Sequence, residues 1–158
     1  MTVHSWRAVA ALFSLLLTLG LDAAGQARPS LIAPRVGGTV TQNAPGAALA
    51  RKRPVEVDFS LLSSVRDALQ LRPGVAQQME IPFFEDRTLT INLERMERIG
   101  RGVTNFYGTV EGDPLGQAVV TQSRGNVGVT VFTQGLAYQV RLDGVGSYVA
   151  QEVNRGNL

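Results

Sequence analysis

The chain has 158 residues, of which 44% are hydrophobic and 18% charged, and this composition predicts one domain with a packed core plus tails. Its formal net charge of +2 gives no electrostatic basis for binding nucleic acid. Cysteine is absent and the single histidine is His4, which excludes disulfides, metal binding by thiolate or imidazole, and Ser-His-Asp or Cys-His catalysis from the rest of the chain.

Residues 1–27 are predicted to be a secretory signal peptide. Arg7 supplies the positive charge, an apolar stretch covers residues 8–21, and small residues lead to a cleavage site after Ala27. The alternative is a membrane anchor, but the stretch is shorter than the roughly 20 residues of a spanning helix, and Asp22 ends it. We therefore expect a secreted or periplasmic protein with no stable membrane insertion after cleavage.

Residues 28–54 are predicted to be a disordered linker. Prolines and glycines interrupt this segment, and no apolar periodicity is sustained along it. It contains one basic cluster, residues 51–53. We interpret this cluster as a solvated run at a domain boundary, with a processing site or an anion-binding spot as the alternatives.

A β-rich domain is predicted over residues 55–158, beginning with a strand at 55–59 and a short helix capped by Ser60. The helix ends at residues 72–74. Its apolar residues recur at helical spacing; they are Leu61, Leu62, Val65 and Leu69.

A hairpin follows, with Glu85 and Asp86 near its turn. Pro82 lies inside the first strand and predicts an edge position, because proline cannot donate to a neighbouring strand. The charged residues 94–101 either extend the hairpin or form a helical turn. The apolar faces of the two strands are Met79, Ile81 and Phe83, and Leu89, Ile91 and Leu93.

The rest of the chain alternates apolar residues between glycine-bearing turns, including one at residues 112–116. We therefore predict a mainly β fold, an antiparallel meander forming a sandwich or partly open barrel, with one short helix. The ordered part is small, so a large cofactor cavity would compete with the core. The expected strands are 103–110, 117–122, 127–132, 136–142 and 148–153.

No catalytic, cofactor-binding or metal-binding residue is assigned, no cofactor is expected, and we predict that the protein is not an enzyme. The adjacent carboxylates Glu85 and Asp86, and the pair Glu111 and Asp113, are more simply explained as turn residues. The glycines at 125–128 precede a strand rather than a phosphate-binding helix. The aromatic residues are spread over different strands, which favours core packing.

Four motifs in the second half of the chain resemble motifs of a known protein family. They lie at residues 105–112, 117–121, 125–129 and 136–140. They are an aromatic-x-Gly-x-Val-x-Gly strand, a strand of small and apolar residues, a Gly-x-x-Gly turn and strand, and a Tyr-x-Val strand. Their order resembles the propeptide region of reprolysin-type (adamalysin) zinc metalloproteases. The matching residues are Tyr107, Gly108, Val110, Gly112, Gly125, Gly128 and Tyr138.

The resemblance implies a non-catalytic propeptide-like module that binds, chaperones or inhibits a secreted zinc metalloprotease, or the remnant of a truncated precursor. The sequence holds neither the protease family's His-Glu-x-x-His motif nor a cysteine that could block its zinc. The alternative function is a structural or small-ligand-binding β-barrel protein of the cell envelope. The first hypothesis predicts an exposed apolar patch or an open sheet edge, and the second a pocket inside the barrel. A carboxylate-only enzyme, the least favoured alternative, requires two carboxylates that face each other in a cleft.

Overall fold

The structure is a computed structural model that describes residues 27–154. The predicted signal peptide therefore lies outside the described residues except for its last residue. Within the described range, no helix has the length and hydrophobicity needed to cross a membrane.

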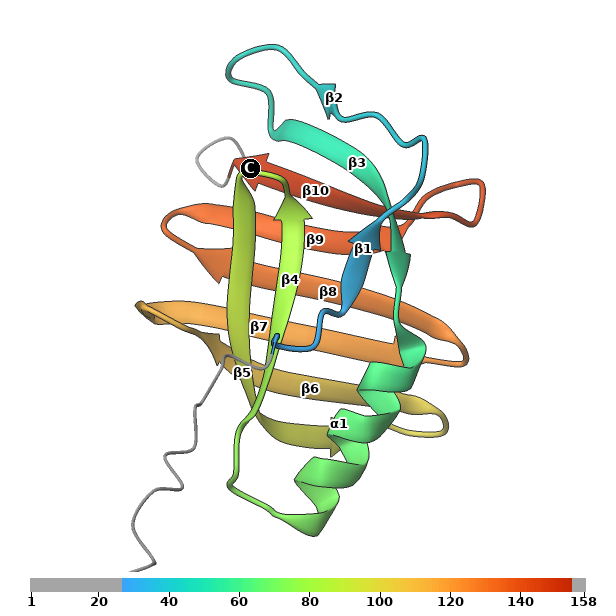
Figure 1. Cartoon of the computed structure of the whole chain (residues 1–158), viewed down its shortest axis with the longest axis vertical. Coiled ribbons are helices and arrows are strands. Elements are labelled where there is room, and N and C mark those ends of the chain that lie inside the picture. Colours follow the sequence, from blue (N-terminus) through green and yellow to red (C-terminus); the bar gives the residue numbers. More distant parts are fainter. Residues whose placement is uncertain (1–26, 155–158) are drawn as a thin grey trace, which may run out of the picture.

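One antiparallel sheet, curved into a nearly closed barrel, makes up most of the described part of the chain, in which a single helix lies across the lower end of the barrel (Figure 1). Each strand from β4 to β9 pairs with the next one along the chain. The elements are β1 (Ile32–Pro34), β2 (Thr41–Gln42), β3 (Leu49–Val57), α1 (Phe59–Leu71), β4 (Gln77–Phe84), β5 (Arg87–Arg98), β6 (Val103–Val110), β7 (Asp113–Ser123), β8 (Asn126–Thr133), β9 (Leu136–Leu142) and β10 (Tyr148–Asn154).

The barrel closes where the start of the described chain meets β4. The sheet order is β1-β3-β10-β9-β8-β7-β6-β5-β4, with β2 beside β3, so β1 and β4 stand at its two ends. The backbone N–H of Glu80 donates to the carbonyl oxygen of Pro29 (2.9 Å), and its carbonyl accepts from the N–H of Leu31 (3.0 Å). These two bonds join the segment before β1 to β4 and nearly close the sheet into a barrel.

The predicted mainly β antiparallel fold with one helix is confirmed, and its form is a barrel. The predicted hairpin is present as β4 and β5, and its apolar residues face one another, with Met79 opposite Ile91 and Ile81 opposite Leu89. Pro82 lies, as predicted, on β4, the last strand of the sheet order. The charged segment after the hairpin extends it, because β5 continues to Arg98.

Residues 28–54 are not the linker that their composition predicts. They contribute β1, β2 and most of β3, and Leu31 and Ile32 are fully buried. The strand expected at 55–59 therefore begins earlier, at Leu49, and includes the basic cluster 51–53. The apolar residues of this region follow no sustained period, and the strands form because β10 and β4 supply partners that are distant in sequence.

Two local predictions also need correction. The helix is capped by Asp58 rather than Ser60, since the Asp58 carboxylate accepts hydrogen bonds from the N–H groups of Ser60 (2.9 Å) and Leu61 (3.2 Å). The turn after β6 is formed by Glu111 and Gly112, and the expected turn residues Asp113 to Gly116 begin β7.

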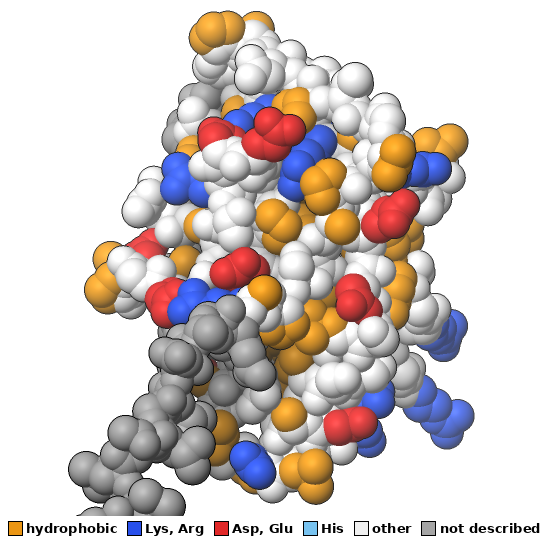
Figure 2. Space-filling view, in the orientation of Figure 1, with side chains coloured by type: hydrophobic (Ala, Val, Ile, Leu, Met, Phe, Trp, Pro, Cys, Tyr) orange, Lys and Arg blue, Asp and Glu red, His pale blue; other side chains and the backbone are white. Residues whose placement is uncertain are grey.

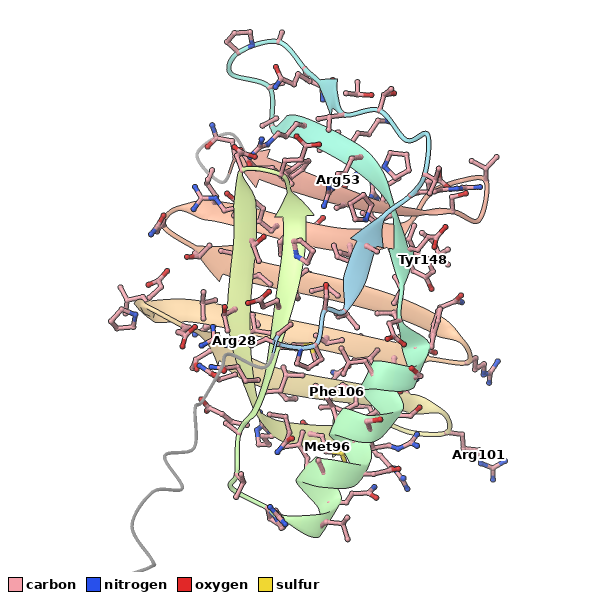
Figure 3. All side chains as sticks on the ribbon, in the orientation of Figure 1. Arg28, Arg53, Met96, Arg101, Phe106 and Tyr148 are labelled. Atoms are coloured by element: carbon pink, nitrogen blue, oxygen red, sulfur yellow. The ribbon has the colours of Figure 1, made fainter. Side chains whose placement is uncertain are left out.

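The interior of the barrel is filled by its own side chains. The helix α1 packs against the lower end with its buried residues Leu62, Val65 and Leu69. The alternating apolar residues of the strands point inward and pack against them. Figure 3 shows Phe106 and Met96 beside the helix. The largest fully buried side chains are Tyr138, Phe83, Phe84, Phe106, Leu31, Ile32, Leu62, Met79, Ile81, Ile91, Leu93 and Val120.

Gly108 of β6 lies where the backbone of β5 comes closest. The pairing of β5 with β6 shifts register between Leu93 and Arg95, and an added Cβ at Gly108 would overlap the carbonyl of Asn92 and lie 2.9 Å from the Cα of Leu93. Gly128 of β8, by contrast, has open space around its Cβ position. Gly108 is thus required for this strand pairing, whereas Gly128 is not.

We predict that Gly108→Ala lowers the free energy of unfolding by about 1–3 kcal/mol, because backbone atoms cannot move aside cheaply. Gly128→Ala, the matched control, is expected to be neutral or to stabilise by up to about 1 kcal/mol. Urea unfolding of both variants measures the difference. Equal effects of the two substitutions would contradict this account of Gly108.

Candidate functional site

Arginines gather at two places on the barrel, and the first is the seam between β3 and β4. Arg53 of β3 is only 5% exposed, and its Nη2 donates a hydrogen bond to the carbonyl oxygen of Pro82 on β4. Figure 3 places Arg53 near the upper ends of these strands. Because Pro82 has no N–H and its carbonyl is bound by Arg53, another strand cannot pair with β4 at this position.

Arg51 lies two residues earlier on the same strand and is neutralised by carboxylates. Its Nη2 lies 2.8 Å from Oε2 of Glu152 and its Nη1 lies 2.8 Å from Oδ1 of Asp86. The guanidinium also stacks 4.0 Å above the centre of the Phe84 ring. Burial lowers the pKa of Arg51, but the hydrogen bonds to Asp86 and Glu152 outweigh burial and raise its pKa overall.

Three buried polar atoms near this seam have no hydrogen-bond partner among residues 27–154: Nε of Arg53, Nε of Arg87 and the hydroxyl of Tyr138. Burial lowers the pKa of Arg53, and the neighbouring Arg51 lowers it further, although Glu85 partly offsets both. Burial, and then the negative charge of Glu152, raise the pKa of Tyr138, so its hydroxyl stays protonated. The arrangement suits closing the barrel rather than proton transfer, since its carboxylates hold Arg51.

The second arginine group lines an open cavity of about 340 Å³ at the lower end of the barrel. We call it the arginine pocket. Its guanidinium groups come from three separate elements: Arg66 from α1, Arg98 from β5 and Arg124 from the turn between β7 and β8. The remaining lining residues are Gly100, Gly102, Val103, Thr104, Gln122 and Gly125.

Hydrogen bonds between neighbouring turns position the walls of the pocket. The N–H of Ile99 donates to the carbonyl of Val103 (3.0 Å) and closes the β5–β6 turn. The N–H of Arg124 donates to the carbonyl of Gly102 (3.4 Å), so the β7–β8 turn is held beside it. Arg66 is placed by α1 and lies one turn after the buried Leu62, beside the face of the helix that packs into the barrel.

The pocket carries little compensating negative charge. Nε of Arg66 lies 3.2 Å from Oδ1 of Asp67, an exposed contact. Across residues 27–154, neither Arg98 nor Arg124 forms an ion pair with a carboxylate. Figure 2 shows basic side chains gathered at the lower right of the molecule, where Figure 3 labels Arg101.

The structure separates the carboxylates that the sequence places next to each other. Asp86 binds Arg51, Glu111 pairs with Arg28 at 2.7 Å, and Asp113 accepts a hydrogen bond from Thr133 (2.6 Å). The basic cluster 51–53, interpreted from the sequence as a solvated run, instead has Arg53 buried in the seam.

Sequence analysis missed the arginine pocket. Its arginines are far apart along the chain, and no local motif links them. The one available signal was an arginine directly before Gly125 in a short hairpin turn, a position where asparagine or glycine is preferred.

Comparison with known proteins adds information about the fold. No family model matches the chain, and no curated protein matches it. One similar solved structure is a chain in a structure of a chaperone–substrate complex, with a TM-score of 0.51 and 11% sequence identity. The match covers 82% of this chain and 88% of that chain, so the resemblance extends over nearly the whole fold.

We predict that Arg51→Gln lowers the free energy of unfolding by about 1–3 kcal/mol, because it leaves the largely buried Glu152 without its cation. Arg95→Gln removes the same charge from an exposed pair, 3.5 Å from Glu97, and is expected to cost less than about 1 kcal/mol. Chemical unfolding of both variants tests the difference. A larger loss for the Arg95 variant would contradict the role given to Arg51.

Stability is expected to fall in acid. Hydrogen bonds lower the pKa of three aspartates: Asp58, mainly through the Ser60 side chain; Asp86, through Arg51; and Asp113, through Thr133. A lowered folded-state pKa contributes stability that is complete above the unfolded value of about 3.9 and is lost as the pH falls through the folded value. The free energy of unfolding, measured as a function of pH, should therefore decline below about pH 4. In the Asp113→Asn variant this decline should be smaller. Constant stability over this range would contradict the prediction.

Proposed function

We propose that the protein is a non-catalytic binding module whose partner is a secreted zinc metalloprotease, which it helps to fold or holds inactive. The resemblance to reprolysin-type propeptides suggests the class of partner. The observation that carries the proposal is the filled interior of the barrel, because a barrel packed with its own side chains can offer a partner only its outer surface.

The filled interior also argues against the alternative of a small-ligand-binding barrel. Such a protein needs a pocket between the apolar faces of its strands. Here Phe83, Phe106 and Tyr138 occupy that space and are at most 1% exposed. The arginine pocket lies outside this core, at the lower end of the barrel, and is open and polar.

Docking by addition of a strand to β4 is disfavoured. Glu80 already uses its outward N–H and carbonyl on Pro29 and Leu31. Pro82 lacks the donor, and Arg53 binds its carbonyl. A partner is therefore expected to use side chains on the loops rather than this sheet edge.

Two neighbouring loops present apolar side chains that suit such docking. Val36, in the segment between β1 and β2, is 97% exposed, and Val145, between β9 and β10, is 87% exposed. A hydrogen bond from Nη1 of Arg35 to Oγ of Ser147 (2.9 Å) ties the two loops together. Exposed apolar residues on fixed, adjacent loops are typical of contact surfaces.

The structural comparison is compatible with a binding role. The similar chain of low sequence identity belongs to a chaperone–substrate complex, so a fold of this shape occurs in an assembly of a chaperone with its client. We transfer to the present protein only the idea that such a barrel can act by binding another protein.

The proposal is tested by mixing the purified protein with a secreted zinc protease, carrying the His-Glu-x-x-His motif, from the same organism. We expect a complex in size-exclusion chromatography, and either lower activity of the native protease or higher recovery of activity after refolding. The absence of both a complex and any effect on the protease would overturn the proposal.

The docking loops are tested by the double variant Val36→Asp and Val145→Asp, which places charge on the apolar contact. We expect the affinity for the protease to fall by about tenfold or more. Leu115→Asp is the matched control, because Leu115 is 88% exposed but lies at the start of β7. Equal losses in the two variants would show that the loops are not the contact.

A further inference from the structure

We propose that the arginine pocket is a binding site for a ligand that carries two or more oxyanion groups, carboxylate or phosphate. This inference goes beyond the proposed function and does not depend on a protease partner. It rests on the geometry and charge of the pocket between α1, the β5–β6 turn and the β7–β8 turn.

The first observation is a contrast between the ion pairs of the two arginine groups. In the seam, Arg51 is held by two carboxylates at 2.8 Å, and its charge is matched within the fold. In the pocket, Arg98 and Arg124 form no such pair with any residue in the range 27–154, and Arg66 has only its exposed contact with Asp67. The positive charge around this cavity is therefore not matched within the described residues, and an anionic ligand can match it.

The second observation is the backbone conformation of Arg124. Its φ angle is +45°, in the left-handed region that Asn, Asp or Gly occupy most easily, and Gly125 follows at +85°. Arginine gains nothing from this conformation itself, yet the conformation directs its side chain along Gly102, with Cγ 3.7 Å from the position a Cβ would take there. Gln134, followed by Gly135 in the β8–β9 turn, has the same conformation (φ +47°), so the geometry belongs to this kind of two-residue turn. At Arg124 it places a cation at the cavity.

Glycines form the turns beside the cavity. Gly100 and Gly102 have φ angles of +64° and +86°, and no atom lies within 4 Å of the Cβ position at Gly100 or Gly125. The turns therefore have backbone conformations that favour glycine.

The guanidinium group determines which chemical groups the ligand must carry. Its planar N–H groups bind carboxylate or phosphate oxygens in pairs, and arginine stays charged at every physiological pH. A cavity of about 340 Å³ whose lining includes three arginines is larger than one oxyanion requires. Both small organic acids or phosphates and an acidic stretch of a protein satisfy this chemistry.

The test is isothermal titration calorimetry of the whole secreted chain at low ionic strength with three probes: pyrophosphate, citrate and a peptide of four glutamates. We expect saturable binding of at least one probe, weakened by added salt. Binding of citrate or pyrophosphate would identify a small-ligand site, and binding of the peptide alone would identify a site for an acidic protein segment. Failure of all three probes to bind would overturn the proposal.

Two variants locate the site. Arg124→Asn supplies the residue that the turn prefers, so the protein should resist urea at least as well as the parent, while affinity for the probe falls by about tenfold. Arg98→Gln is expected to weaken binding by a similar factor. Because Arg124→Asn does not threaten folding, a loss of affinity cannot be assigned to unfolding.

Two matched controls complete the design. Arg95→Gln removes one positive charge from β5 outside the pocket, and Gln134→Asn makes the same kind of turn replacement at a residue with φ +47° between β8 and β9. Both should leave affinity within about twofold of the parent, since neither residue lines the cavity. If Arg95→Gln weakened binding as much as Arg124→Asn, the probes would be responding to net charge and the pocket would not be a site.

Discussion

The hydrogen bonds between Glu80 and the segment Pro29–Leu31 are the constraint on which the rest of the structure depends. Without them the curved sheet would end in two open edges, at β1 and β4. With them, and with Arg53 bound to the Pro82 carbonyl above them, the sheet is nearly closed around a single apolar interior. A nearly closed, filled barrel leaves little open edge for strand addition, so recognition is left to its loops and ends.

The two arginine groups show how the same residue type serves opposite purposes. In the seam, desolvation would make a bare guanidinium costly, so Glu152 and Asp86 compensate Arg51, and Phe84 covers it. At the other end, the guanidinium groups remain near solvent and need no internal partner. We assign the first group to the fold and propose a ligand for the second.

Much of the fold could be predicted from the sequence, because apolar and polar residues alternate along a strand when one of its faces is buried. Val127, Val129 and Val131 alternate on β8 and are at most 3% exposed. The strands within residues 28–54 were not accessible, since β1 has three residues and is held by partners distant in sequence. The arginine pocket could not be predicted for the same reason. It is formed by α1 and two turns together, whereas a sequence pattern indicates one element at a time.

Amide hydrogen exchange of the whole chain tests the closure of the barrel most directly. If the sheet is closed as described, the N–H groups of Leu31 and Glu80 are protected from exchange to nearly the same degree as those in the middle of β8. Exchange at these two amides as fast as at the exposed loop around Gly37 would show that the seam is open. The sheet edge would then be available to a partner, and the account of a sealed barrel acting through its loops and ends would be wrong.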